Sequence, residues 1–472
     1  MSKWKITVRI GAFIICAAML LCGLTVLLKD KRVTFDYDTT RKIKGFYAEE
    51  KDSLDFVFVG SSQMFTSVVP AVLWKEYGIT SYDFGANEQP MYLSYYYIKE
   101  ALNYQNPKAI VLEVSYCKGL DYTHEGVHHI NLDDLRMGPV KLEAIFDVIP
   151  EGERLPYIFE LSKYHDTWPN LTKEGFKYLV SDKNNPYKGY TPSVEGAADG
   201  GIYNEEIANV TERKELPEFS VNYMKKIIAL CKENDVDLVF LKTPNDHIDN
   251  QPYYNAVADL AEEHDVPYLN LNGEMPGQLH NHVFHAETIT KRIGEWLLSL
   301  YDVEDKRENP AFAQWHEDAD YYYRYKHQLK LNEIETYEEF IAELIGKDYL
   351  ICIAVNHDAG AYLSDEAVEL MYQLGLKGDV SKAGGNSYLA VVENGVLHAE
   401  DASVDVLAYE NRFYGHRIKV VSQGSQAGSE ASILVDGEEY APDEKGFNIV
   451  VYDPKADVIL TCRSFEITDD GM

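Results

Sequence analysis

The feature that most constrains this chain is an uninterrupted apolar segment close to its N-terminus. Residues 10–28 contain no charged side chain. At 1.5 Å per helical residue they span about 28 Å, close to the hydrocarbon thickness of a bilayer. The segment ends in Val26, Leu27 and Leu28, not in the small residues that precede a signal-peptide cleavage site. We therefore expect residues 1–32 to form an uncleaved membrane anchor, with residues 10–28 crossing the membrane once.

Two further features bear on the processing and orientation of this anchor. Cys22 precedes Gly23, as in a lipoprotein, but Leu21 is bulky where lipoprotein processing requires a small residue, so we do not expect lipidation. Basic residues flank the apolar segment on both sides, so counting positive charges does not fix its orientation. The short head and long acidic remainder favour a single-pass protein of the cell membrane with the bulk of the chain extracellular.

Size and charge limit the remaining possibilities. The chain has 472 residues, and a single core rarely grows beyond about 250–300 residues, so two domains are expected after the anchor. The 77 acidic and 44 basic side chains give a formal net charge of -33. Such a charge repels the phosphate backbone, which excludes nucleic acid as a partner.

Short apolar runs alternate with amphipathic stretches through residues 45–301. Strands are expected at residues 54–59, 81–84, 109–114, 236–241 and 267–271, and helices at residues 70–77, 91–104, 221–234, 253–264 and 286–301. This alternation predicts an α/β fold with a doubly wound, mainly parallel sheet of the flavodoxin type, whose ligands bind at the carboxyl ends of the strands. Residues 115–215 interrupt the pattern and are expected to form a helical insertion over that same edge.

The pattern changes in the last third of the chain. Residues 302–346 are rich in charge and tyrosine and predict a solvated helical linker. Residues 347–472 combine apolar alternation with Gly-rich turns, which predicts a β-rich, sandwich-like domain. Cys352 and Cys462 lie in two of its expected strands and either pair, if those strands are neighbours, or are simply two small buried apolar residues. No cysteine spacing typical of a metal site occurs.

The most informative motif is FVFVGSSQMF at residues 56–65. A strand that ends in Gly60, Ser61 and Ser62 and then enters a helical turn presents a hydroxyl at the carboxyl end of the strand, where a general base can reach it. The alternative is a serine-rich turn that only caps a helix.

The wider sequence resembles the SGNH (GDSL-type) hydrolase superfamily. The similarity starts with VFVGSSQMF and continues through FLKTPN at residues 240–245 and DVPYLNLN at residues 265–272; YHDTW at residues 164–168 is similar too. Within the superfamily the chain resembles bacterial envelope acyl-transfer proteins of the teichoic-acid D-alanylation and alginate O-acetylation type. The resemblance implies a serine esterase or acyltransferase that needs no cofactor.

Carried over position by position, the resemblance assigns Ser62 as the nucleophile and its backbone N–H as an oxyanion donor. Ser61 stands where the family has its first Asp. The second oxyanion block ends at Glu88, which supplies an N–H where the family has Gly. Cys117 occupies the position of the family's Asn, so one side-chain donor is missing, and Asn87 or Gln89 is a candidate substitute.

The family's D-x-x-H block places the general base at His280, with Gly277 where the Asp is expected. A two-residue deletion would move the role to His282, and Glu274 or a backbone carbonyl would then orient either imidazole. His280, His282 and His285 do not predict a metal site, because this spacing has no fixed geometry in a loop.

From about residue 347 the sequence resembles the ILEI/PANDER domain, through CIAVNHDAGAYLSDEAVELMYQLGL, SYLAVVENG and GFNIVVYDPKADVILTCRSFEI. That resemblance implies recognition, such as carbohydrate binding or docking, and no catalysis. The combined expectation is an envelope acyl esterase or acyltransferase that acts on a cell-surface polysaccharide or acylated polymer, with a membrane-bound acyltransferase as a possible partner. The alternative is a non-catalytic surface binding or assembly protein on the same scaffold.

Overall fold

The computed structural model describes residues 3–29, 31, 39–119, 124–181, 183–201, 205–358, 363–378 and 384–467. The chain divides into two compact units, Met1–Tyr322 and Tyr323–Met472. The division falls inside helix α15 (Ala313–Glu333), within the stretch expected to be a linker. Each unit is therefore described by itself.

The first unit begins with one long apolar helix, α1 (Lys3–Leu28). Its segment Ile6–Leu28 is long and apolar enough to cross a membrane, a property that a signal sequence shares. Helix α2 (Thr39–Phe46) follows and is largely buried, because Ile43 and Phe46 pack into the unit.

A five-stranded parallel sheet forms the centre of the first unit. Its strands are β1 (Phe56–Val59), β2 (Ser81–Asp83), β3 (Ala109–Glu113), β4 (Asp237–Lys242) and β5 (Tyr268–Asn270). Their spatial order is β2-β1-β3-β4-β5, and every neighbouring pair is parallel. In this order the chain reverses direction across the sheet between β1 and β3, which is where doubly wound sheets bind ligands.

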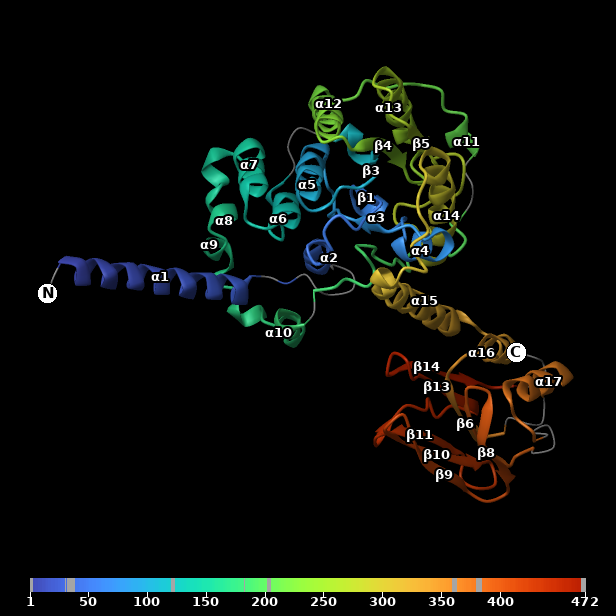
Figure 1. The fold of residues 1–472 in the computed structure, drawn as a ribbon. Coiled ribbons are helices and arrows are strands. Elements are labelled where there is room, and N and C mark those ends of the chain that lie inside the picture. The colour runs from blue at the N-terminus through green and yellow to red at the C-terminus, as the bar shows by residue number, and fades with distance from the viewer. Residues whose placement is uncertain are drawn as a thin grey trace. The chain divides into compact units, whose positions relative to one another are not determined.

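Helices cover both faces of this sheet (Figure 1). On one face α4 (Pro70–Tyr77) packs against α14 (Val283–Leu300); on the other α5 (Met91–Tyr104) packs against α12 (Glu218–Glu233). The pattern is set by period-2 alternation in β1, where Phe56 and Phe58 join Leu73 and Ile293 in one apolar core. Helix α13 (Gln251–Glu263) connects β4 and β5. These findings confirm an α/β fold with a parallel sheet.

The insertion between β3 and α12 is helical. It contains 3-10 helices at Ser115–Lys118 (η2), Glu151–Glu153 and Trp168–Asn170, and helices α6 (Glu125–Leu132), α7 (Pro139–Val148), α8 (Leu155–Ile158), α9 (Leu161–Tyr164), α10 (Lys173–Val180) and α11 (Glu205–Ala208). Helices α8 to α10 gather around the end of α1 (Figure 1). The middle of the insertion therefore lies beside the apolar helix, while Ser115 at its start and residues 191–197 near its end lie at the carboxyl edge of the sheet.

Helix α15 is not solvated along its first half, contrary to the expectation of an exposed linker. Trp315 packs on Trp74, with ring centroids 5.6 Å apart, and Tyr322 is fully buried. A 3-10 helix at Pro310–Phe312 directly precedes α15. Elsewhere in the unit, a 3-10 helix at Ile248–Asn250 directly precedes α13. The high charge of this stretch led to the expectation of a solvated helix, although its aromatic residues pack against the first unit.

The second unit is a nine-stranded, mostly antiparallel sheet with two helices, α16 (Tyr337–Leu344) and α17 (Asp365–Leu374). The strands are β6 (Leu350–His357), β7 (Ser387–Glu393), β8 (Val396–Ser403), β9 (Leu407–Phe413), β10 (His416–Gly424), β11 (Glu430–Val435), β12 (Glu438–Glu439), β13 (Gly446–Asp453) and β14 (Val458–Phe465). Strand β6 is central: Ile351 and Ile353 face a core shared with both helices, while Leu350 and Cys352 face a core shared with β9 to β11. A separate β-rich domain is thus present.

Cys352 and Cys462 do not pair. Both lie opposite Val450, one on each side of β13, so a complete strand separates them. Two strands apart corresponds to about 9.5 Å, beyond the reach of a disulfide. Both thiols are free, which leaves the interpretation of two small apolar residues.

Candidate active site

Ser62 lies at the carboxyl end of β1, on the first residue of the short helix α3 (Ser62–Phe65). Two glycines allow the strand ends to approach closely at this point. A Cβ on Gly60 would lie 2.8 Å from the Cβ of Glu113, and one on Gly85 would lie 2.2 Å from the carbonyl oxygen of Gly60. Because β1 neighbours β3 at the reversal of strand order, this packing holds Ser62 at the expected ligand edge of the sheet.

His280 lies next to Ser62. The distance from His280 Nε2 to Ser62 Oγ is 3.0 Å, which is hydrogen-bonding distance between a nucleophile and its general base. Burial lowers the pKa of His280, Glu195 opposes the shift, and the positive charge of Lys42 adds to it. A lowered pKa favours the neutral imidazole, and in its Nδ1–H tautomer Nε2 accepts the proton of the serine.

The carboxylate nearest to the other imidazole nitrogen belongs to a residue that the sequence did not indicate. Glu195 Oε2 lies 4.0 Å from His280 Nδ1, and its side chain is 82% exposed. Glu274, the expected orienting group, instead forms an ion pair with Arg292 at 3.3 Å. Gly277 has no room for an Asp side chain, because a Cβ there would lie 2.3 Å from the backbone of Pro244.

The last part of the insertion brings Glu195 to this place. The backbone of Thr191 donates to the carbonyl oxygen of Phe65 at 2.8 Å, and that of Val283 donates to the carbonyl oxygen of Ser193 at 2.8 Å. The side chain of Gln278 bonds the backbone of Ala197 in both directions. Residues 191–197 are thus fixed between α3 and the loop that carries His280.

The other two histidines of the segment point elsewhere. His282 is buried and caps helix α14, where its Nδ1 accepts from the backbone N–H of Phe284 at 3.4 Å. His285 Nε2 contacts the carbonyl oxygen of Pro276 at 2.8 Å. Within the part of the chain that the structure describes, no group of three His, Cys, Asp or Glu side chains is arranged to hold a metal ion.

Glu88, which was expected to supply an oxyanion N–H where the family has Gly, has φ +50°. This value lies in the left-handed region that favours glycine. Gln89 is 1% exposed, and its amide accepts from Ala86 N and donates one N–H to Ser94 Oγ, which holds it in the interior. Cys117 is fully buried, and burial raises the pKa of its thiol to about 12, so it remains a neutral thiol.

Gln63 follows Ser62, and buried polar groups fix the orientation of its side-chain amide. Its Oε1 contacts Lys242 Nζ at 3.2 Å, Asn245 Nδ2 at 3.0 Å and Ser115 Oγ at 2.6 Å. An ammonium group only donates, and Asn245 presents its NH2 because its Oδ1 already accepts from the backbone of His247. The buried end of the Gln63 amide is therefore the oxygen, and the two N–H bonds of Nε2 face away from this network.

A buried ion pair supports Gln63. Glu113 and Lys242 are 1% and 0% exposed, and Glu113 Oε1 lies 3.6 Å from Lys242 Nζ. Ser115 donates from its backbone to Glu113 at 3.0 Å, while burial lowers the pKa of Lys242 against the opposing effect of Glu113. Buried charges at the end of a sheet cost stability unless they are paired, and such networks are common at functional sites.

Two further buried ionisable groups, Asp83 and Lys42, interact electrostatically, and Lys42 also acts on His280. Asp83 is completely buried, which raises its pKa well above the usual value, and Lys42 opposes this shift. The ammonium group of Lys42 lies 3.1 Å from the centroid of the Phe65 ring. Lys42 also lowers the pKa of His280, so the N-terminal helix α2 contributes to the electrostatics of the site.

Comparisons with protein-family models, with curated proteins and with solved structures give no significant match.

Of the site residues expected from the sequence, Ser62 and His280 are the two that the structure brings together. It did not predict Gln63, Lys242 or Glu195. Gln63 had a signal, since a side-chain donor was missing and this polar residue follows the serine. Glu195 had none, because its position depends on the path of a 100-residue insertion.

Proposed function

We propose that this chain is a membrane-anchored serine esterase or acyltransferase of SGNH type, acting on an acylated cell-surface glycan or polymer. The observation that carries the proposal is the 3.0 Å contact between His280 Nε2 and Ser62 Oγ, made between residues 218 positions apart in the sequence. A serine hydroxyl is nearly unreactive near neutral pH without a base, and this geometry supplies one.

In the proposed reaction, Ser62 Oγ attacks the acyl carbonyl carbon while its proton passes to His280 Nε2. The carbonyl oxygen then carries the negative charge, which the N–H groups of Ser62 and Glu88 and the Nε2 amide of Gln63 stabilise. The tetrahedral intermediate collapses, and the leaving alkoxide takes the proton from His280. Water or an acceptor hydroxyl then attacks the acyl-serine, with His280 as base again.

Gln63 replaces the missing family Asn in this proposal. The Asn position is occupied by buried Cys117, which cannot donate strongly to an oxyanion. The Gln63 amide is oriented by Lys242 and Asn245 with its N–H bonds away from the buried network, so its direction is fixed before substrate binds. A donor held in advance is more effective than one that must reorganise.

The second unit is proposed as a recognition module. Its central strand has apolar cores on both faces. His416 lies near the surface, where it bridges Asp436 and Asp457 at 2.7 Å each. Its resemblance to the ILEI/PANDER domain supports carbohydrate binding or docking. Catalysis is assigned to the first unit alone.

Helix α1 is proposed to stay in the cell membrane with both units outside the cell. Its segment Ile6–Leu28 would hold the chain through apolar contact with lipid, which neither salt nor alkali disrupts. Alkaline carbonate should therefore leave the protein in the membrane fraction. A soluble chain that starts after residue 28 would contradict the anchor.

A rival function is a binding or assembly protein that has lost catalysis. The observation that favours it is the weak support of His280, since Glu195 is at 4.0 Å and largely exposed. Labelling by a panel of activated acyl esters separates the two. Wild-type chain should be acylated at Ser62, S62A should not be labelled, and S61A should retain labelling because Ser61 is buried. Absence of labelling in wild-type chain would overturn the enzyme proposal.

A further inference from the structure

Outside α1, most of the exposed large apolar side chains of the first unit lie in one segment, residues 137–180 of the insertion. Six of its large apolar side chains are about half exposed or more: Met137, Phe146, Leu155, Trp168, Phe176 and Val180. Among the described residues from 39 to 132, no large apolar side chain is exposed to this degree. An exposed apolar patch of this kind on a soluble surface marks a site of contact.

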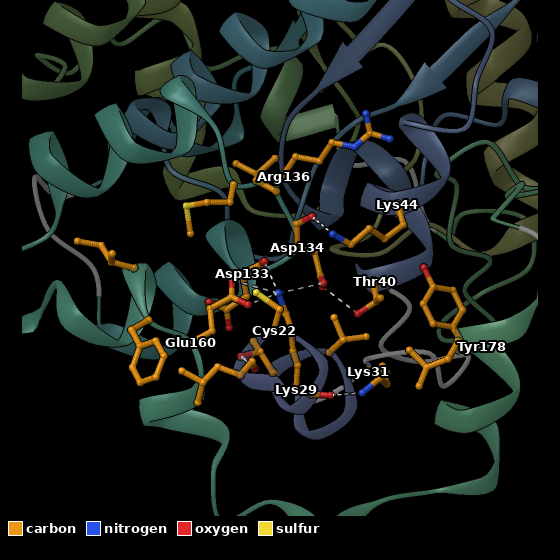
Figure 2. A pocket seen from close by; sticks show the side chains of 18 residues that line it. Cys22, Lys29, Lys31, Thr40, Lys44, Asp133, Asp134, Arg136, Glu160 and Tyr178 are labelled. Carbon is orange, nitrogen blue, oxygen red and sulfur yellow. Dashed lines mark hydrogen bonds and ion pairs between the residues drawn. The ribbon is translucent and has the colours of Figure 1, made fainter. Parts of the chain in front are cut away.

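The same segment is bound to the end of α1. Lys29 reaches from the end of the helix to Glu160 at 3.2 Å and to Asp134 at 3.7 Å, and it also donates to the carbonyl oxygen of Asp133 (Figure 2). Thr167 donates its hydroxyl to the carbonyl oxygen of Leu28. Lys141 joins the cluster through Glu160 at 2.7 Å. These contacts fix the segment at the height where α1 ends.

The segment also extends back along α1. A pocket of about 520 Å³ is lined by Leu21 and Val26 of α1 on one side and by Ile158 and Phe159 of the insertion on the other. Leu21 lies seven residues before Leu28, about 10 Å along the helix. The apolar segment of 23 residues is about 34 Å long, against about 30 Å of hydrocarbon, so Leu21 lies inside the bilayer boundary when α1 spans it.

Helix α10 has the character of an interfacial helix. Tyr178 faces inward and is buried, whereas Phe176 and Val180, four residues apart, lie together on the outer side. Lys173 and Lys177 are exposed beside them. Apolar side chains flanked by lysines are typical of helices that lie in the plane of a membrane surface.

We propose that segment 137–180 rests on the outer surface of the bilayer that α1 spans, with these apolar side chains in the interface. The occupant is the lipid surface, because Met137, Ile158 and Phe159 of this segment line a pocket with α1, and Thr167 bonds the end of that helix. This contact would hold the first unit, and with it Ser62, in one orientation relative to the membrane. The proposal depends on the anchor and not on the chemistry of Ser62.

The test uses tryptophan fluorescence of the full chain in bilayers whose phosphatidylcholine chains carry bromine, a quencher confined to the membrane. Trp4 lies at the start of α1 and is replaced by Phe to remove its emission. In this W4F background we expect bromine to quench the emission that is lost on adding W168F. A W168F/V180W chain should regain quenched emission, and W168F/L300W, with Trp at the exposed end of α14, should give unquenched emission.

The result that overturns the proposal is unquenched emission from both Trp168 and V180W in chains that are inserted. Insertion is verified independently, because Trp4 of the unmodified chain must be quenched when α1 spans the bilayer. Unquenched emission in inserted chains would favour a protein partner as the occupant of the patch in place of lipid. Thermal unfolding of each variant excludes misfolding as the cause.

Discussion

The two units of this chain bury very different side chains. In the first unit the interior holds Lys42, Asp83, Glu113, Lys188 and Lys242, together with several other ionisable groups. Among the described residues of the second unit, Asp453 is the one buried acidic or basic side chain, and it pairs with Arg324 at 3.5 Å. Because a buried charge is costly unless it is paired, the interior of the first unit bears an electrostatic cost that the interior of the second unit largely lacks.

Sheet topology explains where these polar groups gather. In the first unit all five strands are parallel, so their carboxyl ends meet at one edge, and Ser62, Glu113 and Lys242 come from three strands to that edge. In the second unit most neighbours are antiparallel, so the ends of successive strands alternate between opposite edges. An antiparallel sheet does not collect the ends of its strands in this way.

Replacement of His280 should have the largest effect on the first unit, measured as the rate of Ser62 acylation, and none on the second unit. H280A removes the base from Ser62, and the rate of Ser62 acylation by an activated ester should fall by about 10²–10⁴. H282A, the matched control, removes the cap of α14 together with a ring contact to Phe284, and should lower stability by about 1 kcal/mol or more while labelling continues. If H282A stops labelling and H280A does not, the two-residue deletion in the family pattern is correct.

Q63E tests the proposed oxyanion donor with an almost isosteric change. The oxygen that accepts from Lys242 and Asn245 stays, while the outward NH2 becomes an oxygen that repels the developing negative charge. Acylation of Ser62 should slow by about 10²–10³ with no change in fold. S115A is the control, because it removes one contact to the same Gln63 oxygen without altering the amide, and its effect should be much smaller.

These two outcomes also separate the donor from the enzyme proposal. If wild-type chain is labelled and Q63E is labelled equally fast, Gln63 has no role as a donor, but the roles of Ser62 and His280 stand. If wild-type chain is not labelled at all, the enzyme proposal fails before Gln63 is tested.

The second unit should respond to apolar truncation and not to changes at the site. Phe340 of α16 is fully buried in the core of this unit, so F340A should lower its stability by about 3–5 kcal/mol. Ser62 labelling of the full chain should not change. The measurement is thermal unfolding of the chain alongside the labelling rate, and slower labelling in F340A would mean that the units are energetically coupled.

The same core sets the limits of a stable fragment. Tyr337 and Leu344 of α16 pack in the core with Phe447 of β13, although their sequence was expected to be a linker. A fragment that begins at residue 323 should therefore unfold cooperatively. One that begins at residue 347, the expected domain boundary, should be much less stable, and equal stability of the two would contradict a structural role of α16.

Local sequence predicted the regular elements well because local chemistry specifies them. Helix α4 begins at Pro70 and stops at Gly78 with φ +69°, and helix α17 is capped by Ser364 and ends at Gly375, as these residue types predict. The contact of Ser62 with His280 could be predicted only through a family pattern, since no local signal joins positions so far apart.

Inferences that depend on long-range packing were left open by the sequence or were wrong. The pairing of Cys352 with Cys462 depended on strand order, and β13 lies between them. Trp315 and Phe340 are buried, although the many charged residues of the expected linker indicated a solvated helix. Glu274 was near His280 in sequence, but Arg292 holds it elsewhere.

Replacement of Glu195 should have the smallest effect on the acylation rate, and it tests whether a carboxylate supports His280. It lies 4.0 Å from His280 Nδ1 and raises the pKa of His280, although burial still lowers that pKa overall. E195Q removes the stabilisation of the imidazolium, so the lower inflection of the acylation pH profile should move to still lower pH. Because the carboxylate is 82% exposed, water and salt screen it, and the rate near pH 7 should fall by less than about tenfold. E274Q is the matched control and should change neither the inflection nor the rate, since Glu274 pairs with Arg292. Profiles measured at low and high salt should converge for wild-type chain and E195Q as salt rises. An unchanged inflection in E195Q would mean that the Glu195 carboxylate does not affect the pKa of His280.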